Sequence, residues 1–267
     1  MQSLAPAFRS LKSAMLEHAR VISALMLRDI KTRFGATYFG FLGGLIMPLG
    51  HIAIILTIYI ALGRRAPIGT DVALYLGTAI VPFILWSYTH QKVMQSFSQN
   101  RALTSFPIVK FGDILIARSL VELLNAVLIV CVVATALFMR GSDLFINDQP
   151  SFLYVLILAY ALGISTGFIF GLLAMLMPAF MLVGFVFIPL YWATSGVFFI
   201  PEALPEQARV AIAVFPLSHI VDFGRSAFYA SYLSDYPNLL YVHMVIVGNI
   251  MVGLAIERFL RPILTAN

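Results

Sequence analysis

The chain has 267 residues, of which 61% are apolar and only 11% are charged, and its formal net charge is +5. Soluble domains usually carry about 25% charged residues, so this composition excludes an ordinary water-soluble protein. Long continuous apolar runs favour membrane-spanning α-helices over a β-barrel, whose strands would alternate over about 10 residues. The lone Cys131 excludes an intrachain disulfide. We therefore expect an all-α membrane protein with a single transmembrane domain over residues 1–267.

The first 35 residues are predicted to form a cytoplasmic arm. Apolar residues recur every three or four positions from Leu16 to Phe34, whereas Arg20, Arg28 and Lys31 fall off this stripe. This pattern predicts an amphipathic helix lying in the membrane interface. The same basic residues interrupt any apolar core of a signal peptide.

Six later segments are long and apolar enough to cross a bilayer, which takes roughly 20 residues. They are 37–62, 72–96, 115–139, 152–176, 179–199 and 238–257. Spans one to five therefore occupy residues 37–199. The sixth span and a cytoplasmic tail occupy residues 238–267. A tight turn is expected at Met177-Pro178. The region 200–237 contains two short amphipathic pieces, 202–214 and 217–230, joined at Phe215-Pro216. Each is too short to span, which predicts a re-entrant helical hairpin in the periplasmic leaflet.

Basic residues set the expected orientation. With both ends inside, twelve of the 17 Lys and Arg residues lie on the cytoplasmic side. The other five are Arg64, Arg65, Arg140, Arg209 and Arg225. This bias follows the positive-inside rule and predicts that both termini of this inner-membrane protein are cytoplasmic.

Small and charged residues inside the spans have structural interpretations. Gly163, Gly167 and Gly171 are four residues apart, which favours close helix packing within the bundle over a dedicated dimer seam. Arg118 and Glu122 are spaced to form a pair that extends toward the cytoplasm. His219, Asp222 and Arg225 share one face of the second hairpin piece, where we expect a surface row with Ser218 capping the helix. A substrate gate is the alternative role for this row.

Aromatic residues suggest a route for a polymer. Tyr38, Tyr59, Trp86 and Tyr88 carry polar groups on flat rings, which could stack on sugar faces. Packing or a membrane-interface belt is the alternative for each of them. His51 and His90 have no partner at metal-ligand spacing, so no metal site is expected. The chain has no GxxxxGK[ST] phosphate loop, so we expect it neither to hydrolyse ATP nor to hold a cofactor.

Four motifs resemble one protein family. They are LMLRDIKTRFG at 25–35, IVPFILWS at 80–87, NRALTSFPIVKFGDILIAR at 100–118 and FPLSHIVDFGRSA at 215–227. In this order and spacing they are similar to ABC-2-type permeases, particularly the capsular-polysaccharide exporters. Family members often carry Asn where this chain has Phe215, a departure that affects only the hinge of the hairpin.

The resemblance implies a homodimer that moves a lipid-linked polysaccharide from cytoplasm to periplasm. A separate ATP-binding subunit would hold ATP and Mg²⁺, and a periplasmic co-polymerase and an outer-membrane exporter would continue the path. The interfacial helix and the loop after span two would contact the ATPase. The residues so implied are Arg28, Asp29, Arg33, Asn100, Arg101 and Phe106.

Three alternatives remain from sequence. One is a related permease for O-antigen, teichoic acid or a drug. A second is a membrane glycosyl- or acyltransferase, which would need a clustered acid, base or metal constellation. A third is a secondary transporter, which would need intramembrane charges or repeated broken helices.

Overall fold

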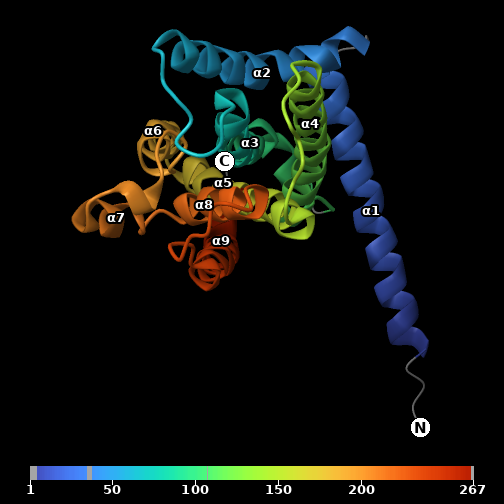
Figure 1. Cartoon of the computed structure of the whole chain (residues 1–267). Coiled ribbons are helices and arrows are strands. Elements are labelled where there is room, and N and C mark those ends of the chain that lie inside the picture. Colours follow the sequence, from blue (N-terminus) through green and yellow to red (C-terminus); the bar gives the residue numbers. More distant parts are fainter. Residues whose placement is uncertain (1–4, 35–37, 107, 266–267) are drawn as a thin grey trace.

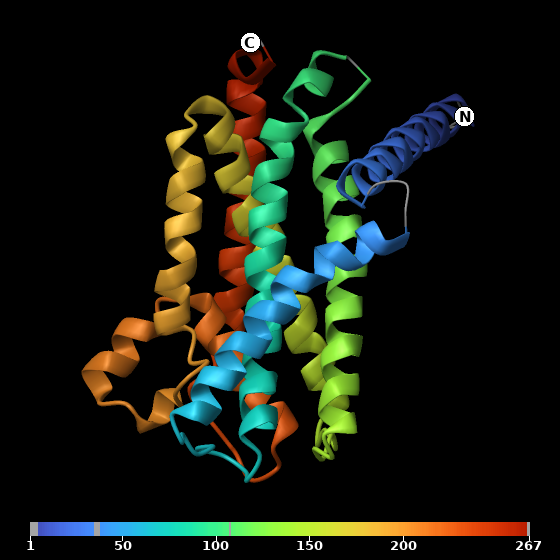
Figure 2. The same ribbon diagram turned by 90° about the horizontal axis from the view of Figure 1, so that it is seen from above.

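The computed structural model describes residues 5–34, 38–106 and 108–265, and every regular element in these ranges is helical. The elements are α1 (Ala5–Phe34), α2 (Tyr38–Ala61), α3 (Val72–Gln99), η1 (Arg101–Ser105), α4 (Phe111–Met139), α5 (Gln149–Leu176), α6 (Ala179–Thr194), η2 (Pro201–Ala203), α7 (Glu206–Ile212), α8 (Pro216–Phe228) and α9 (Leu239–Thr265). Figure 2 shows α3, α4, α5, α6 and α9 as an upright bundle. The helix α1 leans away at the end where α9 finishes, and α7 lies at the opposite end. The predicted all-α class is confirmed.

Local chemistry fixes where the helices begin and end. Asp71 caps α3, because its Oδ1 accepts a hydrogen bond from the Ala73 N–H at 2.8 Å. Asp148 caps α5 in the same way, accepting from the Ser151 N–H at 3.1 Å. Such caps satisfy N–H groups that have no partner inside the helix. Pro178 follows α5, and the chain turns into α6 at Ala179, as the sequence predicted.

Five of the described helices are long and apolar enough to cross a membrane, namely α2, α3, α4, α5 and α9. The predicted fifth span, 179–199, is a shorter helix: α6 has 16 residues and ends at Thr194. At about 1.5 Å per residue it covers about 24 Å, less than the hydrocarbon core of about 30 Å. Gly196, with a φ of 77°, takes the chain out of helical geometry. The hairpin is present as α7 and α8, which bend by 108° at their break; the count of spans reaches six only if this pair is one broken span.

The helix α3 forms the centre of the bundle, since 83% of its most apolar 18-residue stretch is buried, against 11% of residues 44–61 of α2. Figure 1 shows α2 along one side, with α3 between it and α5. The glycines of α5 face α3 closely. A Cβ at Gly163 would lie 2.8 Å from the Trp86 carbonyl oxygen, and one at Gly171 would lie 2.4 Å from Phe97 Cδ2. The predicted role of these glycines in packing within the bundle is confirmed.

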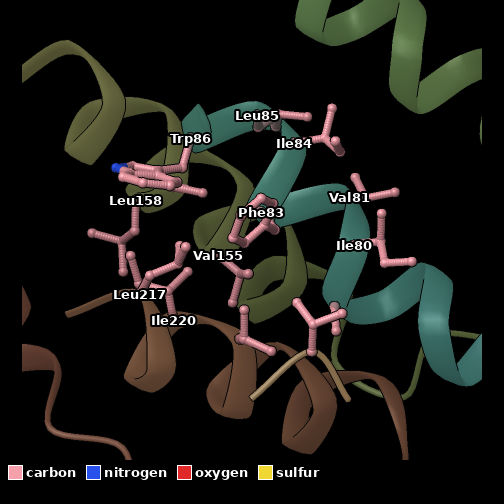
Figure 3. Close-up of a cluster of buried hydrophobic side chains, with 14 of the residues drawn as sticks. Ile80, Val81, Phe83, Ile84, Leu85, Trp86, Val155, Leu158, Leu217 and Ile220 are labelled. Atoms are coloured by element: carbon pink, nitrogen blue, oxygen red, sulfur yellow. The ribbon is translucent and has the colours of Figure 1, made fainter. Parts of the chain in front are cut away.

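The hydrophobic core joins α3, α5 and α8. In Figure 3, Phe83 and Trp86 of α3 lie near Leu158 of α5, with Leu217 and Ile220 of α8 below them. All five side chains are at most 3% exposed. The second piece of the hairpin is therefore part of the core.

Candidate functional site

The segments implied to contact an ATPase meet at one end of the bundle. The guanidinium of Arg28 on α1 donates a hydrogen bond to Asn100 Oδ1, and Asn100 Nδ2 donates to the Ser96 carbonyl oxygen at 2.7 Å. Asn100 is buried and joins α3 to η1. One side chain thus connects α1, α3 and the loop after α3.

The other residues implied for this contact differ in accessibility. Phe106 is 57% exposed and Arg101 is half-buried, so the loop offers a surface to a partner. Asp29 is buried against α4. The side chain of Arg33 lies outside the described residues. The geometry separates accessible loop residues from Asn100 and Asp29, which face other parts of the same chain.

A buried charge centre surrounds Arg118 of α4. Its Nη1 lies 2.7 Å from Asp29 Oδ2 on α1, and its Nε lies 3.4 Å from Glu122 Oε1 and donates to the Lys92 carbonyl oxygen of α3 at 3.0 Å. The predicted Arg118–Glu122 pair is confirmed. Its expected extension toward the cytoplasm is wrong, because Arg118 is 1% exposed and binds α1 and α3 instead. Sequence reasoning missed the Asp29–Arg118 pair, since no spacing rule relates residues 89 positions apart.

This centre predicts strong coupling between α1 and α4. Asp29→Ala should destabilise the fold by about 3 kcal/mol, because it leaves the Arg118 guanidinium buried with less compensating charge. In the double variant with Arg118→Met the loss should be clearly smaller than the sum of the two single losses. Thermal unfolding of the purified protein measures both, with Lys31→Ala, an exposed change on α1, as control. Additive losses would contradict the coupling.

Aromatic rings form a series from the surface to the core at the other half of the bundle. Tyr59 and Phe198 line a groove of about 430 Å³, with ring centroids 6.5 Å apart. The series continues from Phe198 to Trp192 at 5.6 Å and from Trp192 to Phe83 at 3.8 Å. It ends at Trp86, whose centroid is 5.6 Å from that of Phe83.

The predicted polymer-path residues therefore lie at different depths. Tyr59 is half-buried at the groove, Tyr88 is half-buried on α3, and Trp86 is 1% exposed in this chain. The side chain of Tyr38 lies outside the described residues. Sequence reasoning did not find Phe198 as a ring next to Tyr59, because it follows the end of α6.

Arg225 of α8 is completely buried and holds the segment after α6. Its guanidinium donates to the carbonyl oxygens of Gly196, Val197 and Phe199 at 2.6, 2.8 and 2.8 Å. It also lies 4.4 Å from the centroid of the Tyr75 ring. The expected surface row is wrong, because His219, Asp222 and Arg225 are at most 3% exposed.

The neighbours of Arg225 on α8 have equally local partners. Tyr232 donates to Asp222 Oδ1 at 2.7 Å. Burial and the nearby Asp222 carboxylate raise the pKa of Tyr232, so its hydroxyl keeps the proton that it donates. His219 Nε2 donates to the Ala213 carbonyl oxygen at 2.9 Å. Ser218 bonds the Phe215 carbonyl oxygen and provides no helix cap, contrary to expectation. These bonds fasten α8 to adjoining segments; a gating role stays a prediction.

The fold and these sites define a multi-pass helical membrane protein with a buried charge centre at one end and an aromatic groove at the other. No protein-family model matches the chain. It is 27% identical over 238 residues to the polysialic acid transport protein KpsM of Escherichia coli, covering 89% of this chain and 92% of that protein. It is 25% identical over 255 residues to the capsule polysaccharide export inner-membrane protein CtrC of Neisseria meningitidis, with 92% and 93% covered.

A third relative is the capsule polysaccharide export inner-membrane protein BexB of Haemophilus influenzae, 23% identical over 255 residues, with 92% and 93% covered. These relatives confirm the resemblance to capsule exporters that the four motifs predicted. Each match extends over nearly the whole of both chains.

Proposed function

We propose that this chain is the transmembrane permease subunit of an ATP-driven exporter for capsular polysaccharide. The observation that carries the proposal is the match over about nine-tenths of the chain to three proteins of capsule or polysialic acid transport. In this proposal the chain lies in the bacterial inner membrane with cytoplasmic termini. It forms a homodimer, and a lipid-linked polymer crosses to the periplasm, where a co-polymerase and an outer-membrane exporter receive it.

The proposed energy source is a separate ATP-binding subunit, because the sequence has no phosphate loop. Purified chain alone should show no ATP hydrolysis, and its complex with the separate ATP-binding subunit should show turnover that responds to polymer. Contaminant-free ATP turnover by the chain alone would contradict the proposal. As a control, changing the catalytic carboxylate of the partner subunit to an amide should abolish ATP turnover by the complex.

The loop after α3 is the proposed docking surface for that subunit. Arg101→Glu should weaken the complex by about tenfold, which corresponds to about 1.4 kcal/mol, or uncouple ATP turnover from export. Co-purification and ATP turnover in proteoliposomes measure this. The matched control is Arg65→Glu, an exposed charge reversal at the other end of the bundle. If Arg101→Glu and Arg65→Glu have the same effect on complex formation and ATP turnover, the loop is not part of the docking surface.

The aromatic groove is proposed to lie on the polymer path, at the end of the bundle that faces the periplasm in the proposed orientation. Weak, repeated contacts suit conduction, because each contact must break at every step. Tyr59→Ala should lower export while leaving protein level normal, since Tyr59 lies at the groove. Trp86→Ala should instead lower stability by about 3–5 kcal/mol, because it empties a buried site. Surface polysaccharide and membrane-inserted protein are measured together for both variants. If Trp86→Ala loses export while its protein level stays normal, Trp86 belongs to the polymer path and not to the packed core.

A further inference from the structure

The helices α2, α3 and α4 enclose an apolar groove that shares no lining residue with the aromatic groove at Tyr59. Its volume is about 330 Å³, and 12 of its 13 lining residues are aliphatic, alanine or glycine. The only polar one is Arg140. Figure 2 shows that α2 crosses α3 obliquely instead of running beside it. Ala136 of α4 lines the groove and is itself exposed.

The dimensions of the groove match one leaflet of a bilayer. Along α4 the lining extends from Val132 to Arg140. At about 1.5 Å per residue this is about 12 Å, and half of a hydrocarbon core of about 30 Å is about 15 Å. The helices α3 and α4 contribute residues from the same end, where Asp71 begins α3 and Arg140 follows α4, and α2 contributes Leu49 to Leu56 from its middle. The groove therefore starts at a membrane interface and ends near the bilayer centre.

Charges of both signs lie where the groove opens to that interface. Arg140 is exposed at its end. A pocket of about 430 Å³ begins with the next residues of the chain and contains Asp71 and Asp143. Burial raises the pKa of the Asp71 carboxyl, but hydrogen bonds from Ser142 and the first N–H groups of α3 outweigh it, so this pKa lies below its usual value. The opening thus carries a cation, Arg140, whose charge also lowers the pKa of the nearby Asp71 carboxyl.

We propose that this groove binds one acyl chain of a membrane phospholipid whose headgroup carries an ammonium group. The phosphate lies at Arg140, and the ammonium group lies toward Asp71 and Asp143. An acyl chain suits an apolar groove inside the bilayer, because a polar occupant would find no hydrogen-bond partners among its aliphatic lining residues. An anionic headgroup without an amine would meet Arg140 but would be repelled by both carboxylates. The placement of this end in the periplasmic leaflet rests on the proposed orientation.

The test uses the full purified chain, stripped of lipid in detergent, with phosphatidylethanolamine and phosphatidylglycerol added separately. Native mass spectrometry counts the lipid retained. We expect phosphatidylethanolamine to be retained in preference. Ala136→Phe should reduce its retention by about tenfold, whereas Thr135→Phe, the exposed neighbour outside the groove, should not. Arg140→Gln should weaken retention by about fivefold, and Arg65→Gln should leave it unchanged.

Two results would overturn the proposal. One is equal retention by the wild type and Ala136→Phe. The other is binding of phosphatidylglycerol as tight as that of phosphatidylethanolamine. If Ala136→Phe splits a dimer and leaves lipid retention unchanged, the groove is covered by a second copy and the lipid proposal is wrong. Lipid retention is measured on purified protein and does not depend on export. A failed lipid proposal can therefore be told apart from a failed transport proposal.

Discussion

Arg225→Ala is expected to destabilise the bundle by about 3–5 kcal/mol, more than any other single change on the hairpin. The guanidinium is 0% exposed and bonds three carbonyl oxygens of the segment after α6. Alanine would leave these oxygens without their donor inside the protein, and a buried unsatisfied acceptor is costly. It would also remove the charge that faces Asp222 and the contact with the Tyr75 ring. The temperature at which purified protein leaves the monodisperse peak in size-exclusion chromatography measures the loss.

Two further variants separate geometry from charge at this site. Arg225→Lys keeps the charge, but a single ammonium group cannot reproduce the planar fork of donors, so a substantial part of the loss should remain. Arg65→Ala removes an exposed arginine at the same end of the protein and should change stability by less than about 0.5 kcal/mol. An unchanged unfolding temperature for Arg225→Ala would show that Arg225 does not hold the segment after α6.

Gly167→Ala is expected to force α5 away from α3. A Cβ at this position would lie 2.7 Å from the His90 carbonyl oxygen and 2.8 Å from Val93 Cβ. Neither atom can move alone, because one belongs to the backbone of α3 and the other is fixed to it. Overpacking of this kind costs about 1–3 kcal/mol, and here it acts on the most buried pair of helices.

The control for Gly167 is another helical glycine. A Cβ at Gly248 of α9 would meet no atom within 4 Å, so Gly248→Ala should be neutral or slightly stabilising. Both variants are compared by thermal unfolding and by the amount of protein inserted in the membrane. If both glycines tolerate alanine equally, close α3–α5 contact does not stabilise the bundle.

The sequence predicted features that depend on neighbouring residues. Continuous apolar runs located α2, α3, α4, α5 and α9, and Phe215-Pro216 located the break before α8. The four-residue spacing of Arg118 and Glu122 predicted their pair. In each case a short stretch of chain contains all the residues that determine the structure.

Features that depend on distant contacts were not predictable. The apolar run 179–199 continues past Thr194, yet α6 ends there, and the carbonyl groups beyond it bond Arg225 of α8. The polar residues of α8 suggested an exposed face, but their partners come from loops on both sides of that helix. Asp29 gave no sign of pairing with Arg118, because only the packing of α1 on α4 brings them together.

The most direct test of polysaccharide export is to delete the gene in its own host. Capsular polysaccharide is then quantified at the cell surface and inside the cell, with the intact chain and the Arg101→Glu variant returned separately. The account predicts that surface polymer is lost and accumulates inside, and that the intact chain restores export while the variant restores it poorly. Normal surface polysaccharide in the deletion strain, with polymer synthesis unchanged, would contradict it.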